Sequence, residues 1–277
     1  MAATPCPVLV VTASVDGNFG RVYDALGAGA LDAVNTPRLD GADGGADGAA
    51  LLAKIDLLGR LLADSAPVAA PPVAPAGSGG AERWLLAIGA SAGGPAALAQ
   101  LLQAFPAGLP AAIVVIQHLD ETFAAGLAEW LGGQIRLPVR LARDGDAPEP
   151  GAVLLPGRAD HLVLTPAGRL VFTPEPVNRA YRPSVDVFFE SVAHHWRGRA
   201  AGVILTGMGR DGAAGLKLMR ERGFPTIAQD RASSAVYGMP KAAAECGAAA
   251  QVLPLAGIAP ALHQLLASAP PPHPSRP

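Results

Sequence analysis

A serine, a histidine and an aspartate each stand directly after a short hydrophobic run of this sequence. Ser91 lies in the glycine-rich turn after the first run, His118 follows the second, and Asp211 comes after the third. Such runs are typical of buried strands, and the carboxyl ends of parallel strands share one edge of a sheet, where ligands bind. At one edge these side chains can form a hydrolytic triad, because the imidazole takes the serine proton while the carboxylate holds the imidazole in its useful tautomer.

The turn at residues 89–94 also allows a second interpretation, a loop that binds phosphate. Glycine-rich turns between a strand and a helix let backbone N–H groups approach a phosphate. A dinucleotide site also needs an acidic residue about 20 positions on, at the end of the next strand. That strand ends instead in Gln117-His118, and Asp120 lies beyond it. The sequence therefore favours the nucleophile, and a nucleotide-dependent α/β protein is the alternative enzyme class.

Strand-like and helix-like segments alternate along the main part of the chain, and this alternation predicts the fold class. The pattern is typical of an α/β fold with a doubly wound, mainly parallel sheet and helices on both faces. Pro166-Ala167-Gly168 predicts the turn of a β-hairpin within it. The expected strands are residues 84–88, 111–116, 153–156, 161–165, 169–173, 203–205 and 226–229, and the expected helices are residues 95–105, 122–131, 184–196 and 213–222.

Composition divides the 277 residues into four parts. Residues 67–81 are rich in proline and glycine, as linkers are. They separate an N-terminal segment, residues 1–66, from the main domain, residues 82–268. The proline-rich tail, residues 269–277, is predicted to be disordered.

Charge and cysteine content exclude several classes of partner. The formal net charge of −2 gives no reason to expect nucleic-acid binding or a membrane-surface footprint. Cys6 and Cys246 show no metal-ligand spacing and predict no disulfide framework. Residues 84–119 carry no Asp, Glu, Lys or Arg, but glycine and proline interrupt them, so no membrane insertion through a helix of ~20 residues is expected. We expect a cytoplasmic protein.

Five segments of the main domain, taken together and in order, resemble the catalytic domain of the protein-glutamate methylesterases of bacterial chemotaxis, the CheB family. These segments are IGASAGGP at residues 88–95, VVIQH at 114–118, RPSVD at 182–186, TGMGRDGA at 206–213 and VYGMP at 236–240. The family cleaves methyl esters of glutamate side chains on chemoreceptors, and many members also deamidate receptor glutamines. The resemblance implies a triad of Ser91, His118 and Asp211, and it implies neither a metal nor an organic cofactor.

The resemblance also implies an oxyanion site and a set of partners. The backbone N–H groups of Ala92 and Met208 would hold the oxyanion. Two departures from the family are visible, since many relatives have threonine at Ala92 and Met-Pro at Leu119-Asp120. The implied partners are methyl-accepting chemoreceptors and other chemosensory signalling proteins.

The N-terminal segment resembles the second half of a receiver domain, which family members commonly carry there. Residues 7–14 resemble the fourth receiver strand, residues 29–37 the fifth strand, and residues 51–63 the last helix, while Thr36 stands at the lysine position. The first half, with the acidic pair and the phosphorylated aspartate, has no counterpart in this sequence. We expect a partial receiver-like α/β segment that is short for independent stability, moves freely on its linker and does not respond to phosphoryl donors.

Two further expectations complete the prediction from the sequence. His161, His194 and His195 lack Cys or carboxylate partners at metal spacing, and we expect them on the surface. The alternative to an enzyme is a signalling adaptor with a vestigial triad, which methanol release from a methylated receptor would distinguish.

Overall fold

A computed structural model describes residues 8–12, 19–28, 30, 32–37, 48, 51–52, 55, 83–179 and 181–268. Its largest sheet has seven strands in the order β11-β10-β9-β3-β4-β6-β5, and each neighbouring pair is parallel. The strands are β3 (Trp84–Ala90), β4 (Ala111–Gln117), β5 (Val139–Leu141), β6 (Val153–Leu155), β9 (Arg199–Ile204), β10 (Thr226–Gln229) and β11 (Gln251–Leu253).

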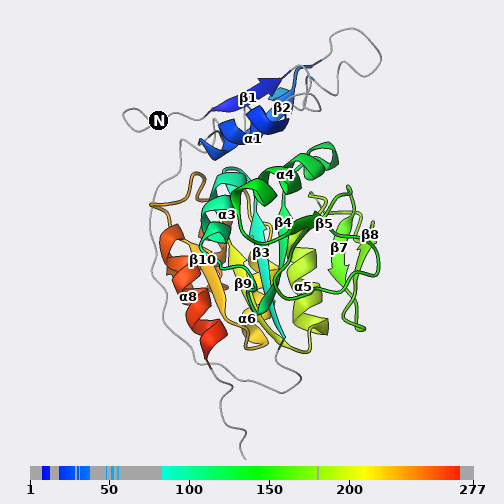
Figure 1. Cartoon of the computed structure of the whole chain (residues 1–277), viewed down its shortest axis with the longest axis vertical. Helices are drawn as coiled ribbons and strands as arrows, with labels where there is room; N and C mark the ends of the chain where they lie inside the picture. The colour runs from blue at the N-terminus through cyan, green and yellow to red at the C-terminus, as the bar shows by residue number, and fades with distance from the viewer. Residues whose placement is uncertain are drawn as a thin grey trace, which may run out of the picture.

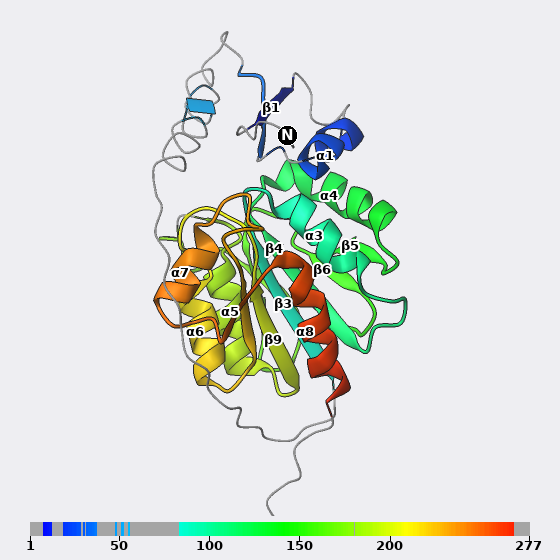
Figure 2. The ribbon, with the colours of Figure 1, turned by 90° about the vertical axis from the view of Figure 1, so that its left-hand side faces the viewer.

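Helices cover both faces of this sheet (Figure 2). One face carries α3 (Gly94–Gln103), α4 (Glu121–Gln134) and α8 (Leu255–Ala267). The other face carries α5 (Val185–His195), α6 (Ala213–Glu221) and α7 (Met239–Glu245). The predicted doubly wound α/β fold is confirmed, and so is the hairpin, because β7 (His161–Leu164) and β8 (Leu170–Thr173) pair antiparallel.

The side chains of β3 show why this strand lies at the centre of the sheet. All seven of its residues are buried. Leu86 and Ile88 belong to the hydrophobic core under α3, α4 and α8, whereas Leu85 and Ala87 belong to the core under α5, α6 and α7. Successive side chains of a strand point to opposite faces, so a strand covered on both faces reads as an unbroken apolar run.

The N-terminal segment contributes a parallel pair of strands and a helix. The strands are β1 (Leu9–Thr12) and β2 (Asp32–Asn35), and α1 (Phe19–Gly27) packs against α3 and α4 (Figure 1). The hydroxyl of Tyr23 donates to the carbonyl oxygen of Phe123 at 2.7 Å, and its ring stacks on Trp130 at 5.9 Å. Burial raises the pKa of Tyr23.

These contacts differ from the expectation of a freely moving segment. The physical reason is the apolar stripe of α1, because Val22, Tyr23 and Leu26 are all buried in the same core as α3 and α4. The predicted linker, the predicted tail and most of residues 51–63 lie outside the described residues.

Candidate active site

The register of β3 and β4 brings Ser91 and His118 to the same edge of the sheet. Ala90 pairs with Gln117, and the N–H of His118 donates to the carbonyl oxygen of Ala90 at 3.0 Å. Ser91 directly follows Ala90, so the candidate nucleophile and the candidate base leave neighbouring strands side by side.

Asp211 lies in the loop between β9 and α6 and contacts His118. Its Oδ2 is 2.7 Å from Nε2 of His118, and the two side chains are only 8% and 7% exposed. The other ring nitrogen of His118, Nδ1, is buried without a hydrogen-bond partner. Among the described residues, no hydrogen bond joins the side chains of Ser91 and His118, so Nδ1 is left available to accept a serine proton. Such contacts are often long without substrate and tighten in the reacting complex.

The carboxylate of Asp211 also lies at the N-terminus of α5. The hydroxyl of Ser184 donates to Oδ1 at 2.7 Å, and the N–H of Val185 donates to Oδ2 at 2.7 Å. Burial raises the pKa of Asp211, but the hydrogen bonds from His118, Ser184 and Val185 outweigh burial and lower that pKa to about 2. The carboxylate is therefore charged near neutral pH, where it can stabilise an imidazolium.

The candidate oxyanion donors Ala92 and Met208 lie in two different turns, and hydrogen bonds of Thr206 hold the turn of Ala92 close to the one that carries Met208. The hydroxyl of Thr206 is 3.0 Å from the carbonyl oxygen of Ala92 and accepts from the N–H of Val236 at 2.9 Å. The backbone N–H groups of Ala92 and Met208 take part in none of the hydrogen bonds among the described residues. N–H groups without a partner in the protein are free to donate hydrogen bonds to the negative charge that develops on the oxyanion.

Tyr181 and Gln117, for which the sequence predicted no role, contact Ser91 or His118. The ring of Tyr181 stacks on that of His118, with centroids 4.1 Å apart and planes 4° from parallel. Nε2 of Gln117 donates to the carbonyl oxygens of both Ser91 and His118, at 2.9 Å and 3.1 Å. Tyr181 directly precedes the RPSVD segment and Gln117 lies within VVIQH. Proximity to these two motifs was the only sequence feature that could have pointed to a role for either residue.

His161 is buried, and the expectation that it lies on the surface is wrong. Its Nδ1 accepts the N–H of Ser184 at 3.1 Å, and its Nε2 lies 3.2 Å from the carbonyl oxygen of Pro176. A neutral ring with its proton on Nε2 satisfies both contacts, and burial lowers the pKa of His161. The hairpin packs on α5, so the first residue of β7 faces the start of that helix instead of solvent. His194 is exposed and His195 is partly exposed.

The part of the chain that the structure describes contains neither a cluster of metal ligands nor a membrane-spanning helix. No group of three or more His, Cys, Asp and Glu side chains among the described residues could hold a metal ion. None of the helices in this part of the chain has the length and apolar character needed to cross a bilayer.

Comparisons with known proteins give the same family for both sequence and structure. Residues 86–262 match the family model for CheB methylesterase. A protein-glutamate methylesterase/protein-glutamine glutaminase 2 of Cupriavidus metallidurans is 59% identical over 262 residues, which are 95% of this chain and 77% of the relative. A protein of Pseudomonas aeruginosa with the same name, numbered 3, is 57% identical over 96% of this chain and 79% of its own length.

The solved structures include a close match as well. The crystal structure of the Thermotoga maritima CheB methylesterase catalytic domain matches with a TM-score of 0.62 and 35% identity, over 67% of this chain and 99% of that one. This chain therefore belongs to the CheB methylesterase family.

Proposed function

We propose that this chain is a serine hydrolase that demethylates glutamate methyl esters on chemoreceptors during chemosensory adaptation. The contact between Asp211 and His118 at 2.7 Å, beside the turn that holds Ser91, carries the proposal. An imidazole with a charged carboxylate on one nitrogen and a vacant second nitrogen is poised to act as a general base.

The reaction follows from these positions. Ser91 Oγ attacks the γ-carbonyl carbon of the ester while His118 Nδ1 takes the hydroxyl proton, and Asp211 stabilises the imidazolium. The N–H groups of Ala92 and Met208 hold the oxyanion. The carbon–oxygen bond to the methoxy group breaks, and methanol leaves with the proton from His118. Water then loses a proton to His118 and attacks the acyl-enzyme, which releases glutamate and free Ser91.

The same groups can deamidate glutamine, with ammonia in place of methanol as the leaving group. The names of the relatives from Cupriavidus metallidurans and Pseudomonas aeruginosa include this second activity. We further infer that methyl-accepting chemoreceptors are the partners, that other chemosensory proteins take part in regulation, and that the chain works in the cytoplasm.

Replacement of the nucleophile tests the proposal. Ser91→Ala should abolish methanol release from a methylated receptor, because no other group in the mechanism forms the acyl-enzyme. Ser268→Ala, which removes an exposed hydroxyl at the end of α8, is the matched control and should keep the wild-type rate. Methanol release from Ser91→Ala at the wild-type rate would refute the assignment.

Replacement of the carboxylate tests the role of Asp211. Asp211→Asn should lower kcat by about 10³–10⁴-fold and leave detectable activity, since the amide disfavours the tautomer that frees Nδ1 of His118. The measurement is steady-state methanol release at neutral pH, with circular dichroism to verify the fold. An Asp211→Asn enzyme within about tenfold of wild type would argue against a triad.

A further inference from the structure

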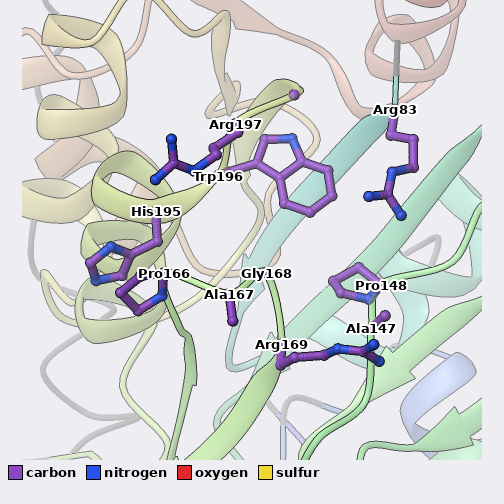
Figure 3. A pocket seen from close by; sticks show the side chains of 11 residues that line it. Arg83, Ala147, Pro148, Pro166, Ala167, Gly168, Arg169, His195, Trp196 and Arg197 are labelled. Atoms are coloured by element: carbon purple, nitrogen blue, oxygen red, sulfur yellow. The ribbon is translucent and has the colours of Figure 1, made fainter. Parts of the chain in front are cut away.

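A pocket opens beside the start of β3, at the end of the strand away from Ser91, and Figure 3 shows the side chains that line it. Its volume is about 260 Å³, and its walls come from segments far apart in sequence. Arg83 precedes β3, Pro148 lies between β5 and β6, Arg169 ends the hairpin turn, and residues 196–198 follow α5. Because β3 runs from this end to Ser91 through seven residues, about 23 Å of strand separates the two sites.

The charged side chains that line this pocket are all basic. Three arginines and one histidine line it, and its lining contains no Asp or Glu. The guanidinium groups of Arg83 and Arg197 have no hydrogen bond or ion pair among the described residues, and that of Arg169 has one hydrogen bond at 3.3 Å, to the carbonyl oxygen of Gly145. The net charge of the whole chain is −2, so this concentration of arginine is a local feature.

Other arginines of the chain, outside this pocket, form ion pairs with carboxylates. Arg158 lies 2.9 Å from Asp144, and Arg179 lies 3.2 Å from Glu190. The pocket arginines differ because their only neighbours in the lining are apolar or cationic. Arg83, Arg169 and Arg197 carry like charges into one pocket, so they repel one another, and a bound anion would reduce that repulsion.

The remaining wall is flat and firmly placed. The indole N–H of Trp196 donates to the carbonyl oxygen of Arg199 at 2.9 Å, which fixes the ring, and Figure 3 shows this ring between Arg83 and Arg197. A side chain at Gly198 would place its Cβ 2.4 Å from the carbonyl oxygen of Arg83 and 2.9 Å from the indole nitrogen. The close packing of residue 198 against Arg83 and Trp196 therefore requires glycine, and this packing helps to fix the indole.

We propose that this pocket binds a small phosphate monoester that carries a flat ring, the chemistry of a nucleoside monophosphate. Guanidinium groups match phosphate oxygens with paired hydrogen bonds, and an indole face accepts a flat ring. The volume is just below the range of about 300–1,000 Å³ for ligand sites, so the ligand is small or keeps part of its ring in solvent. The proposal is independent of catalysis, because no pocket residue belongs to the candidate active site.

Calorimetric titration of the full chain with AMP, adenosine and inorganic phosphate tests the proposal. AMP should bind with a Kd below about 1 mM. Adenosine and inorganic phosphate should each bind about tenfold more weakly, because adenosine lacks the phosphate group and inorganic phosphate lacks the flat ring. Arg83→Gln and Arg169→Gln should each weaken AMP binding about tenfold. Arg222→Gln, an exposed arginine outside the pocket, is the matched control and should leave the Kd unchanged.

Each contrary result overturns the proposal in a recognisable way. Equal affinity for AMP and inorganic phosphate would show an adventitious anion only. AMP binding that survives both pocket variants would place the ligand elsewhere, including the glycine-rich turn at residues 89–94. Thermal melts of both variants show whether they fold, and methanol release by them tests the proposed hydrolase separately.

Discussion

His118 is held on three sides, and only one of these contacts follows from the triad itself. Asp211 contacts Nε2, the ring of Tyr181 covers one face, and Gln117 fixes the backbone that carries the residue. A base that must first take a proton and then return it needs a fixed orientation, because small displacements of reacting groups cost large factors in rate.

The stacking of Tyr181 leads to a prediction about rate. Tyr181→Ala should lower kcat about fivefold, because an aromatic stacking contact worth about 1 kcal/mol no longer fixes the plane of the imidazole. Tyr181→Phe keeps the ring and should retain most of the activity. Methanol release measured over a range of substrate concentrations separates kcat from KM. A Tyr181→Ala enzyme with wild-type kcat would show that the ring has no positioning role.

The elements around the site explain what could be predicted from the sequence. The hydrophobic runs predict β3, β4 and β9 because these strands are buried on both faces, and the polar residues that follow them mark the edge. His161 and Tyr181 were not recognised, since their contacts join the β8–α5 connection to β7 and to the residue that follows β4, which are distant in sequence. β5 and β11 were missed because each has three residues of which one is polar, whereas β6 is equally short but wholly apolar and was predicted.

The turn after β9 depends on a glycine at position 207. A Cβ there would lie 2.4 Å from the sulfur of Met239 and 2.9 Å from Cβ of Ser91. Gly207→Ala should therefore displace the turn that carries Ser91 and lower kcat by more than tenfold. Gly133→Ala on α4 meets nothing within 4 Å and should leave the rate unchanged. Equal rates for the two variants would show that the turn absorbs the methyl group.

The buried His161 leads to a prediction about acid stability. Burial holds its pKa below the unfolded value of about 6.5, so the unfolded chain binds more protons as the pH falls through that value. The stability from neutral His161 is present above about pH 6.5 and is lost below it. The contribution of Asp211, with a pKa of about 2, persists to lower pH and is lost as the pH falls from about 4 towards 2.

Thermal melts between about pH 7 and 5 measure this effect. The melting temperature should fall across this range in the wild type. His161→Asn offers one acceptor and one donor but does not titrate, so its melting temperature should vary less with pH. His194→Asn, at an exposed position, should behave like the wild type. A wild-type slope that persists in His161→Asn would contradict the assignment to His161.

At the scale of the whole molecule, the N-terminal segment and the main domain share one hydrophobic core. The core under α3, α4 and α8 includes Val22, Tyr23 and Leu26 of α1. The described elements of the N-terminal segment are two short strands and one helix, and so few elements bury too little surface of their own for high stability. Contact with α3 and α4 supplies the missing burial, so we expect the two parts to unfold together.

Tyr23 provides the test of this coupling. Tyr23→Ala removes a fully buried ring and should lower the free energy of unfolding by about 3–5 kcal/mol, whereas Tyr23→Phe loses only the hydrogen bond to Phe123, worth about 1 kcal/mol. Urea unfolding followed by circular dichroism should show one transition that shifts in this order. Val11→Ala, at a side chain that is 49% exposed, is the control and should shift it little. If the N-terminal segment were a separate body, Tyr23→Ala would leave the main transition in place, because the core of residues 83–268 would not sense the loss of the ring.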